Sequence, residues 1–435
     1  MKKKPIRIWL GIFMLTALIG VRGYAEENSY TWMLTGTEKV ANNPGLIHFT
    51  WEICQPPYGP YDTITLHRVC HENHILEKPV QYNGKAILFL PGTWNAGGWS
   101  SITDPAVNPW LYLAAHEYDV YVIDFRSTNL PDMDYDQYAG NGIEIAATAD
   151  WTYGMYREDI KTCVEKIKEL ANENKIFLGG FSRGGTYMYM YASQYPGDLK
   201  GLVSLDGDIK DFPPTAPPLD EDTYNQLIDI FKQGLLVDSQ TRQPTPWLFM
   251  VFGLDNRDYN NWKLAGVLPY ARTLAGEPLP GEFAVISDYV ADNLHHLWDA
   301  FGVPLTNYHD GYINRDVLIQ AVNRFSRFHP YRQILEDLQL QAYENVPYFD
   351  YDDHDIYLPA AAFLSPVTCP AKICLLDFIP NMTKSSDVTI YYLESYGHMD
   401  ILFGTYSLPD VKEPLLQWLN NHNQEAARGI GDYKR

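Results

Sequence analysis

The sequence predicts an α/β fold in which helices flank a mostly parallel central sheet and a mainly helical cap is inserted. Three observations favour this fold class. Short runs such as residues 86–90 and the centre of 119–124 are apolar without alternation, which is typical of strands covered on both faces of a parallel sheet. Segments with helical spacing of apolar residues separate these runs. The alternation of strands and helices stops after Asp206 and resumes near residue 356.

The predicted elements follow one another in alternating order. Strands are predicted at residues 45–53, 63–69, 86–90, 119–124, 175–179, 199–205, 356–364 and 388–393. Helices are predicted at residues 110–116, 156–170, 186–194 and 411–420. The segment 207–350 carries Pro-rich punctuation, many aromatic residues and helical patterns without strands between them. We therefore expect a core made of residues 26–206 and 351–435, with 207–350 as the cap.

The first 25 residues have the pattern of a Sec signal peptide. A basic start with four Lys or Arg residues precedes the apolar stretch 8–21, and Gly23 and Ala25 have the spacing of a peptidase site. The apolar stretch is short for a membrane span, which favours cleavage over an uncleaved anchor. No other window is apolar for long enough to cross a bilayer. The sequence therefore predicts an exported protein, periplasmic or extracellular, with no stable membrane insertion after cleavage.

The negative net charge of the chain disfavours binding to negatively charged partners. The chain of 435 residues has a formal charge of -21, and removal of the signal segment takes away five basic and no acidic residues, which gives -26. Such a chain is repelled by nucleic acids and by anionic membranes. Hydrophobic residues make up 46% and charged residues 20%, so a large core is expected and disorder of the whole chain is excluded.

The strongest motif is Gly-Phe-Ser-Arg-Gly at residues 180–184, between the strand 175–179 and the helix 186–194. In the Gly-x-Ser-x-Gly elbow the serine occupies a strained turn, and the glycines let strand and helix approach closely. A structural glycine-rich turn is the weaker interpretation, because the flanking elements are the ones that the elbow requires. Ser182 is therefore the candidate nucleophile.

A serine nucleophile needs a general base, and His398 is the candidate. It follows the last predicted strand and comes far downstream of Ser182, as the order serine, acid, histidine demands. An acid must orient the imidazole. Asp206, at the end of the strand 199–205, is favoured because a strand end fixes a side chain better than a long loop does. Asp377, in the loop after residue 364, is the alternative.

Negative charge on a tetrahedral intermediate needs preorganised donors. The backbone amide of Arg183, directly after the nucleophile, is one candidate. The other comes from the loop after the strand 86–90, and Thr93 is the favoured residue because Gly92 lets the chain turn toward the substrate. No metal or organic cofactor is needed for this chemistry.

The cysteines predict two local disulfides in an oxidising compartment. Cys54 and Cys70 bracket a Pro/Gly-rich loop, and Cys369 and Cys374 bracket four residues. Cys163 lies in a helical pattern and is expected to be a buried, inert thiol. A zinc site at the histidines near Cys70 is a weaker hypothesis, because no acidic partner lies nearby and the disulfide would consume the thiolate.

Together these elements resemble the α/β-hydrolase superfamily over essentially the whole chain after residue 25. A weaker resemblance points to the acid-lipase branch (gastric and lysosomal lipase-like), from residues 109–121, 150–160 and 396–400. This chain departs from that branch in three places. Pro91-Gly92 replaces a His-Gly pair, Phe181 and Arg183 replace a histidine and a glutamine, and the loop after residue 364, the usual place of the acid, begins without a carboxylate.

We therefore predict an exported serine hydrolase, esterase- or lipase-like, that cleaves a carboxylic ester through a Ser-His-Asp triad and an acyl-enzyme. The aromatic, Pro-rich cap favours a hydrophobic small-molecule ester or acyl substrate. Two alternatives remain open. A capped serine peptidase, aminopeptidase-like, would use the same triad, and a non-catalytic binding protein of the same fold would lack an acid near His398.

Overall fold

The structure is a computed structural model that describes residues 31–72, 85–92, 102–129, 151–207, 356–365, 384–394, 396–397 and 399–429, together with Val317, Gln333 and Glu336. The predicted signal segment and several predicted functional residues lie outside the described residues: Thr93, Cys369, Cys374, Asp377 and His398. Of the predicted cap at 207–350, the described residues are Gly207 and the three single residues, each of which is helical.

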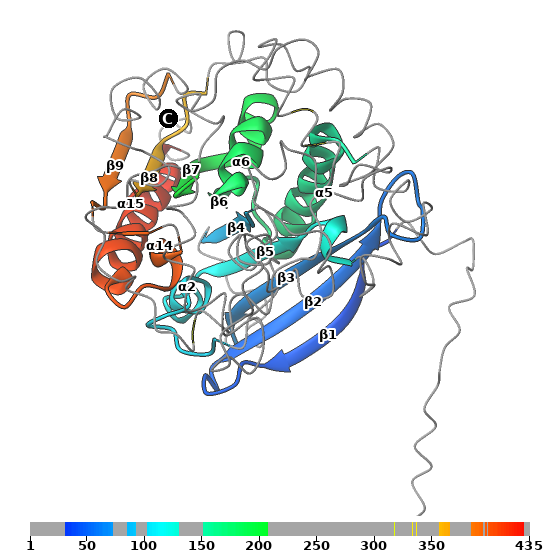
Figure 1. Cartoon of the computed structure of the whole chain (residues 1–435), viewed down its shortest axis with the longest axis horizontal. Helices are drawn as coiled ribbons and strands as arrows, with labels where there is room; N and C mark the ends of the chain where they lie inside the picture. The colour runs from blue at the N-terminus through cyan, green and yellow to red at the C-terminus, as the bar shows by residue number, and fades with distance from the viewer. Residues whose placement is uncertain are drawn as a thin grey trace, which may run out of the picture.

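The strands of the described residues form one nine-stranded sheet in the order β1-β2-β3-β5-β4-β6-β7-β8-β9. Three antiparallel strands begin it: β1 (Met33–Lys39), β2 (Leu46–Cys54) and β3 (Thr63–His71), which also pairs antiparallel with β5. Six strands run parallel to one another: β4 (Ala86–Leu90), β5 (Asp119–Asp124), β6 (Ile176–Phe181), β7 (Leu199–Leu205), β8 (Ala360–Leu364) and β9 (Val388–Tyr392). Figure 1 shows β1 and β9 at opposite ends of the sheet. The predicted, mostly parallel sheet is confirmed.

Helices cover both faces of the sheet (Figure 1). One face carries α5 (Tyr153–Ala171) and α6 (Arg183–Gln194); the other carries α2 (Pro109–Ala115), α14 (Asp400–Phe403) and α15 (Glu413–Gly429). Two of these helices have a polar N-cap residue. The Asn108 side chain accepts hydrogen bonds from backbone amides of α2, and the Thr152 side chain accepts one from the Met155 amide of α5. Within the described ranges, no helix is both long and apolar enough to cross a membrane.

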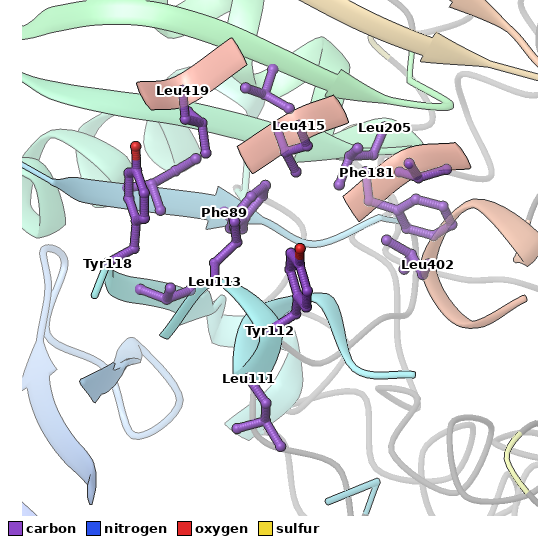
Figure 2. Packing of buried hydrophobic residues seen from close by; sticks show 14 of the residues in the cluster. Phe89, Leu111, Tyr112, Leu113, Tyr118, Phe181, Leu205, Leu402, Leu415 and Leu419 are labelled. Atoms are coloured by element: carbon purple, nitrogen blue, oxygen red, sulfur yellow. The ribbon is translucent and has the colours of Figure 1, made fainter. Parts of the chain in front are cut away.

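A hydrophobic core lies between the sheet and the helices α2, α14 and α15, and it accounts for the apolar runs of the central strands. Every residue of β4 and β5 is buried, as expected of strands covered on both faces. Phe89 of β4 packs with Leu113 of α2 and Leu415 of α15 in one cluster, which Figure 2 shows from close by. The Trp110 ring lies 4.1 Å from the Phe89 ring, measured between centroids. The sheet is therefore held from this side by α2 and α15.

The predicted disulfide between Cys54 and Cys70 is wrong, because both cysteines are free thiols. In the pairing of β2 with β3, Cys54 lies opposite Thr63 and Cys70 lies opposite Ile47. At about 3.3 Å per residue, the seven residues from Thr63 to Cys70 separate the two thiols by roughly 23 Å. A disulfide needs Cα atoms within about 7 Å. The two cysteines close in sequence thus lie at opposite ends of the hairpin.

Candidate active site

Ser182 lies between the last residue of β6 and the first residue of α6, in a backbone conformation that side chains rarely adopt. Its φ is 54° and its ψ is -126°, a strained region for a residue with a Cβ atom. The Ser182 amide donates to the Leu205 carbonyl at 3.1 Å, and the Gly185 amide donates to the Ser182 carbonyl at 2.8 Å. Serine at a helix N-cap usually accepts from first-turn amides, but this side chain makes no such bond. The hydroxyl is therefore not committed to capping α6.

Glycines on both sides of Ser182 let β6 and α6 approach more closely than side chains would allow. A Cβ atom on Gly180 would lie 2.1 Å from the Gly184 carbonyl oxygen, and one on Gly184 would lie 2.1 Å from the Leu90 carbonyl oxygen. Real Cβ atoms essentially never come that close to another heavy atom. Gly180 is therefore required for the contact of β6 with the start of α6, and Gly184 for the contact of α6 with the end of β4.

The predicted oxyanion donors belong to two segments that meet at Ser182. A Cβ atom on Gly92 would lie 2.8 Å from the Ser182 Cβ atom, so the chain that leaves β4 passes directly against the serine. Thr93 follows Gly92 and lies outside the described residues. Arg183 is the first residue of α6, where an amide has no acceptor in its own helix and lies at the positive end of the helix dipole. An amide there is suited to stabilise an oxyanion.

Asp206 follows β7 and is buried, with 1% of its surface exposed. Like Ser182, it has a positive φ, of 46°. Both of its neighbours contact the serine turn: Leu205 accepts the Ser182 amide, and a Cβ atom on Gly207 would lie 2.7 Å from the Ser182 carbonyl oxygen. The structure thus brings the segment of Asp206 against that of Ser182. The alternative acid, Asp377, lies outside the described residues.

Sequence reasoning missed the contact between Asp206 and Ser365. The Ser365 amide donates to Oδ1 of Asp206 at 2.6 Å, and the Ser365 hydroxyl donates to Oδ2 at 2.7 Å. The two residues are 159 positions apart in the chain, and the parallel pairing of β7 with β8 brings them together. The only signal in the sequence is indirect: a buried carboxylate needs donors, and Ser365 opens the loop in which an acid is usually found.

His398 lies outside the described residues, but residues on both sides of it are described. The Gly397 amide donates to Oδ2 of Asp400 at 2.7 Å. Upstream, the Leu393 amide donates to the Leu364 carbonyl at 2.9 Å. The loop that contains His398 therefore starts beside the carboxyl end of β8, the strand that Ser365 follows.

Comparison with known proteins identifies the fold of this arrangement. Residues 85–234 match the α/β hydrolase fold family. The crystal structure of a candidate lipase from Sulfolobus solfataricus superposes with a TM-score of 0.59 at 26% sequence identity, covering 90% of this chain and 99% of that one. The chain has the α/β-hydrolase fold.

Two further likenesses are weaker. Protein phosphatase methylesterase 1 of Candida albicans is 37% identical over 68 residues, which is 15% of this chain and 19% of that enzyme. The match thus spans about a fifth of the curated relative's length. A carboxylesterase structure from Nitrososphaera gargenis has a TM-score of 0.40 and 12% identity, with 84% of this chain and 98% of that chain covered, too low to bear on chemistry. The resemblance to the acid-lipase branch stays a prediction from the sequence.

An aromatic cluster lies beside the hydrolase elbow, between α5 and α6. The Arg183 guanidinium donates to the Tyr153 hydroxyl and lies 5.8 Å from the centre of that ring. Behind Tyr153, the Phe125 and Tyr156 rings stack at 4.3 Å, and Tyr187 lies 5.6 Å from Tyr156. Burial raises the pKa of Tyr156, so its hydroxyl stays neutral. All four aromatic side chains are buried, so the cluster packs α5 against α6 behind the serine turn, and the Arg183 guanidinium is bonded to it.

Two residues from the segment predicted as the cap contact the core at this cluster. The Tyr153 amide, at the first position of α5, donates to Oε2 of Glu336 at 2.7 Å. The Tyr187 hydroxyl donates to Oε1 of Gln333 at 2.6 Å. Gln333 and Glu336 are both buried, so these contacts connect the segment predicted as the cap to the start of α5 and to α6, next to Arg183.

Proposed function

We propose that the protein is an exported serine hydrolase that cleaves carboxylic esters through an acyl-enzyme. The observation that carries the proposal is the backbone of Ser182, a residue with φ 54° and ψ -126° between a buried strand and a helix N-terminus. A strained residue persists where its surroundings over-determine it, and such residues concentrate at functional sites. The hydrolase fold and the likeness to a candidate lipase support ester chemistry.

In the proposed mechanism, Ser182 Oγ attacks the ester carbonyl carbon while His398 accepts its proton. The amides of Arg183 and Thr93 stabilise the oxyanion of the tetrahedral intermediate. That intermediate collapses by breaking the bond to the alkoxide, which takes the proton from His398 and leaves as the alcohol. Water then attacks the acyl-enzyme, with His398 again as the base, and releases the carboxylic acid. Asp206 orients His398 throughout.

We propose a hydrophobic acyl or aryl substrate from the aromatic, Pro-rich composition of the predicted cap. The segment predicted as the cap contacts the start of α5 through Glu336 and contacts α6 through Gln333. The chemistry needs neither a metal nor an organic cofactor. Export is proposed from the signal pattern at residues 1–25, and the formal charge of -26 without that segment, obtained from the composition, disfavours nucleic-acid partners.

Hydrolysis of p-nitrophenyl esters of different chain length, compared with aminoacyl anilides, tests the proposal. We expect ester cleavage by the wild type, none by Ser182→Ala, and a loss of up to about 10⁴-fold in kcat for Asp206→Asn. Asp377→Asn is the matched control and should keep its activity. Cleavage of anilides in place of esters would favour the peptidase alternative. A folded wild type that cleaves neither substrate would contradict catalysis and favour a binding protein.

A further inference from the structure

Ser365 is the first residue after β8 and is completely buried. β8 runs parallel to β7 with Phe363 paired to Leu205, and the Asp206 amide donates to the Phe363 carbonyl at 2.7 Å. Ser365 returns two hydrogen bonds to the carboxylate of Asp206, from its amide at 2.6 Å and from its hydroxyl at 2.7 Å. The end of β8 thus fixes both the backbone and the side chain of Asp206.

One donor on each carboxylate oxygen restricts rotation of the Asp206 side chain, since rotation about the Cβ–Cγ bond would break both hydrogen bonds. Hydrogen bonds to an ionised acceptor are roughly twice as strong as those between neutral groups. A carboxylate has about four lone-pair positions, and the two bonds from Ser365 occupy one on each oxygen. The two bonds therefore fix the plane of the carboxylate.

We infer that Ser365 is a positioning residue that holds the Asp206 carboxylate in the orientation which the catalytic histidine requires. The inference rests on the proposed function, because it gives Ser365 a role in catalysis that acts only through Asp206. A purely structural role, in which Ser365 joins the ends of β7 and β8, makes a different prediction. It lowers stability and leaves the catalytic effect of Asp206 untouched.

The test combines steady-state kinetics with a double-mutant cycle, using a p-nitrophenyl ester. Ser365→Ala keeps the amide bond to Oδ1 and removes only the hydroxyl. We expect kcat to fall by about 10- to 100-fold, the range known for hydrogen-bond partners that orient metal ligands. KM should stay unchanged, because Ser365 is completely buried and acts only through Asp206. In the Asp206→Asn background, the same substitution should change kcat by less than about twofold, because the two residues act as one unit.

Ser407→Ala is the matched control. Ser407 is also completely buried, and its hydroxyl donates to the Gly404 carbonyl at 2.6 Å. This variant should lose stability on urea unfolding and keep the wild-type kcat. The inference is overturned if Ser365→Ala keeps the wild-type kcat, or if it lowers kcat by the same factor with and without Asp206. A folded wild type that leaves the ester intact is a separate result, which overturns the proposed function and the positioning role with it.

Discussion

Replacing Ser182 by glycine should give a more stable protein than replacing it by alanine. Both variants lack the hydroxyl, so they differ only in the Cβ atom. At φ 54° and ψ -126°, a Cβ atom adds strain of about 1–3 kcal/mol. Glycine avoids this strain but gains about 0.4–1 kcal/mol of conformational entropy in the unfolded chain. The midpoints of these two ranges differ by about 1.3 kcal/mol, so we expect Ser182→Gly to exceed Ser182→Ala by about that amount in the free energy of unfolding.

Thr162 provides the control, since it also carries a hydroxyl and lies in the interior of α5 (Tyr153–Ala171). In an ordinary helical conformation glycine is about 1 kcal/mol less stable than alanine, so the order of the two variants should reverse there. Urea unfolding, monitored by circular dichroism, measures the free energy of unfolding of all four variants. Equal dependence of that free energy on urea concentration checks that the variants unfold in the same two-state way. If Ser182→Gly is no more stable than Ser182→Ala, the backbone at position 182 is not strained, and strain no longer supports Ser182 as the nucleophile.

Three other predictions concern the scaffold. Burial and the nearby His67 lower the pKa of His48 from 6.5 to about 4. Because the unfolded chain then binds the proton at a higher pH than the folded protein, this residue should cost about 3 kcal/mol of stability as the pH drops from 6.5 to 4. His48→Gln should flatten that part of the curve of stability against pH, and an unchanged curve would contradict the lowered pKa. Burial lowers the pKa of Lys412 from 10.5 to about 7, so the wild type should gain stability relative to Lys412→Met between pH 7 and 10, as scanning calorimetry can test. Arg126 forms ion pairs with the buried carboxylates of Asp62 at 2.7 Å and Asp159 at 2.6 Å. Arg126→Leu should lower the free energy of unfolding by about 3–5 kcal/mol, because it leaves two buried carboxylates unpaired. A loss below about 1 kcal/mol, measured by urea unfolding, would show that these ion pairs contribute little to stability.

The parallel part of the sheet could be predicted because its signal is local. Residues 86–90 and 119–124 form β4 and β5 with the predicted bounds, since a strand buried on both faces has an apolar run without alternation at its centre. The strand predicted at 356–364 begins only at Ala360, because Pro359 has no amide to donate to a neighbouring strand. β1 was not predicted, because its residues are almost all exposed and show no apolar alternation.

Contacts between residues far apart in the chain are the part of the site that could not be predicted from the sequence. The positions of Ser182 and Asp206 could be predicted because each directly follows a recognisable strand. The contact of Ser365 with Asp206 depends on the neighbouring ends of β7 and β8, which are far apart in the chain. The Cys54–Cys70 pair failed for the same reason: closeness in sequence was taken for closeness in space, whereas the register of β2 with β3 separates the two thiols.

The most direct test of the proposed enzyme is covalent labelling of Ser182 with an alkyl fluorophosphonate, followed by intact mass and peptide mass measurements. We predict a single adduct on the wild type, located on the peptide that contains Ser182. We expect none on Ser182→Ala and much slower labelling of Asp206→Asn than of Asp377→Asn. A folded wild type that takes no adduct, or takes it on another residue, would contradict the assignment of Ser182 as the nucleophile.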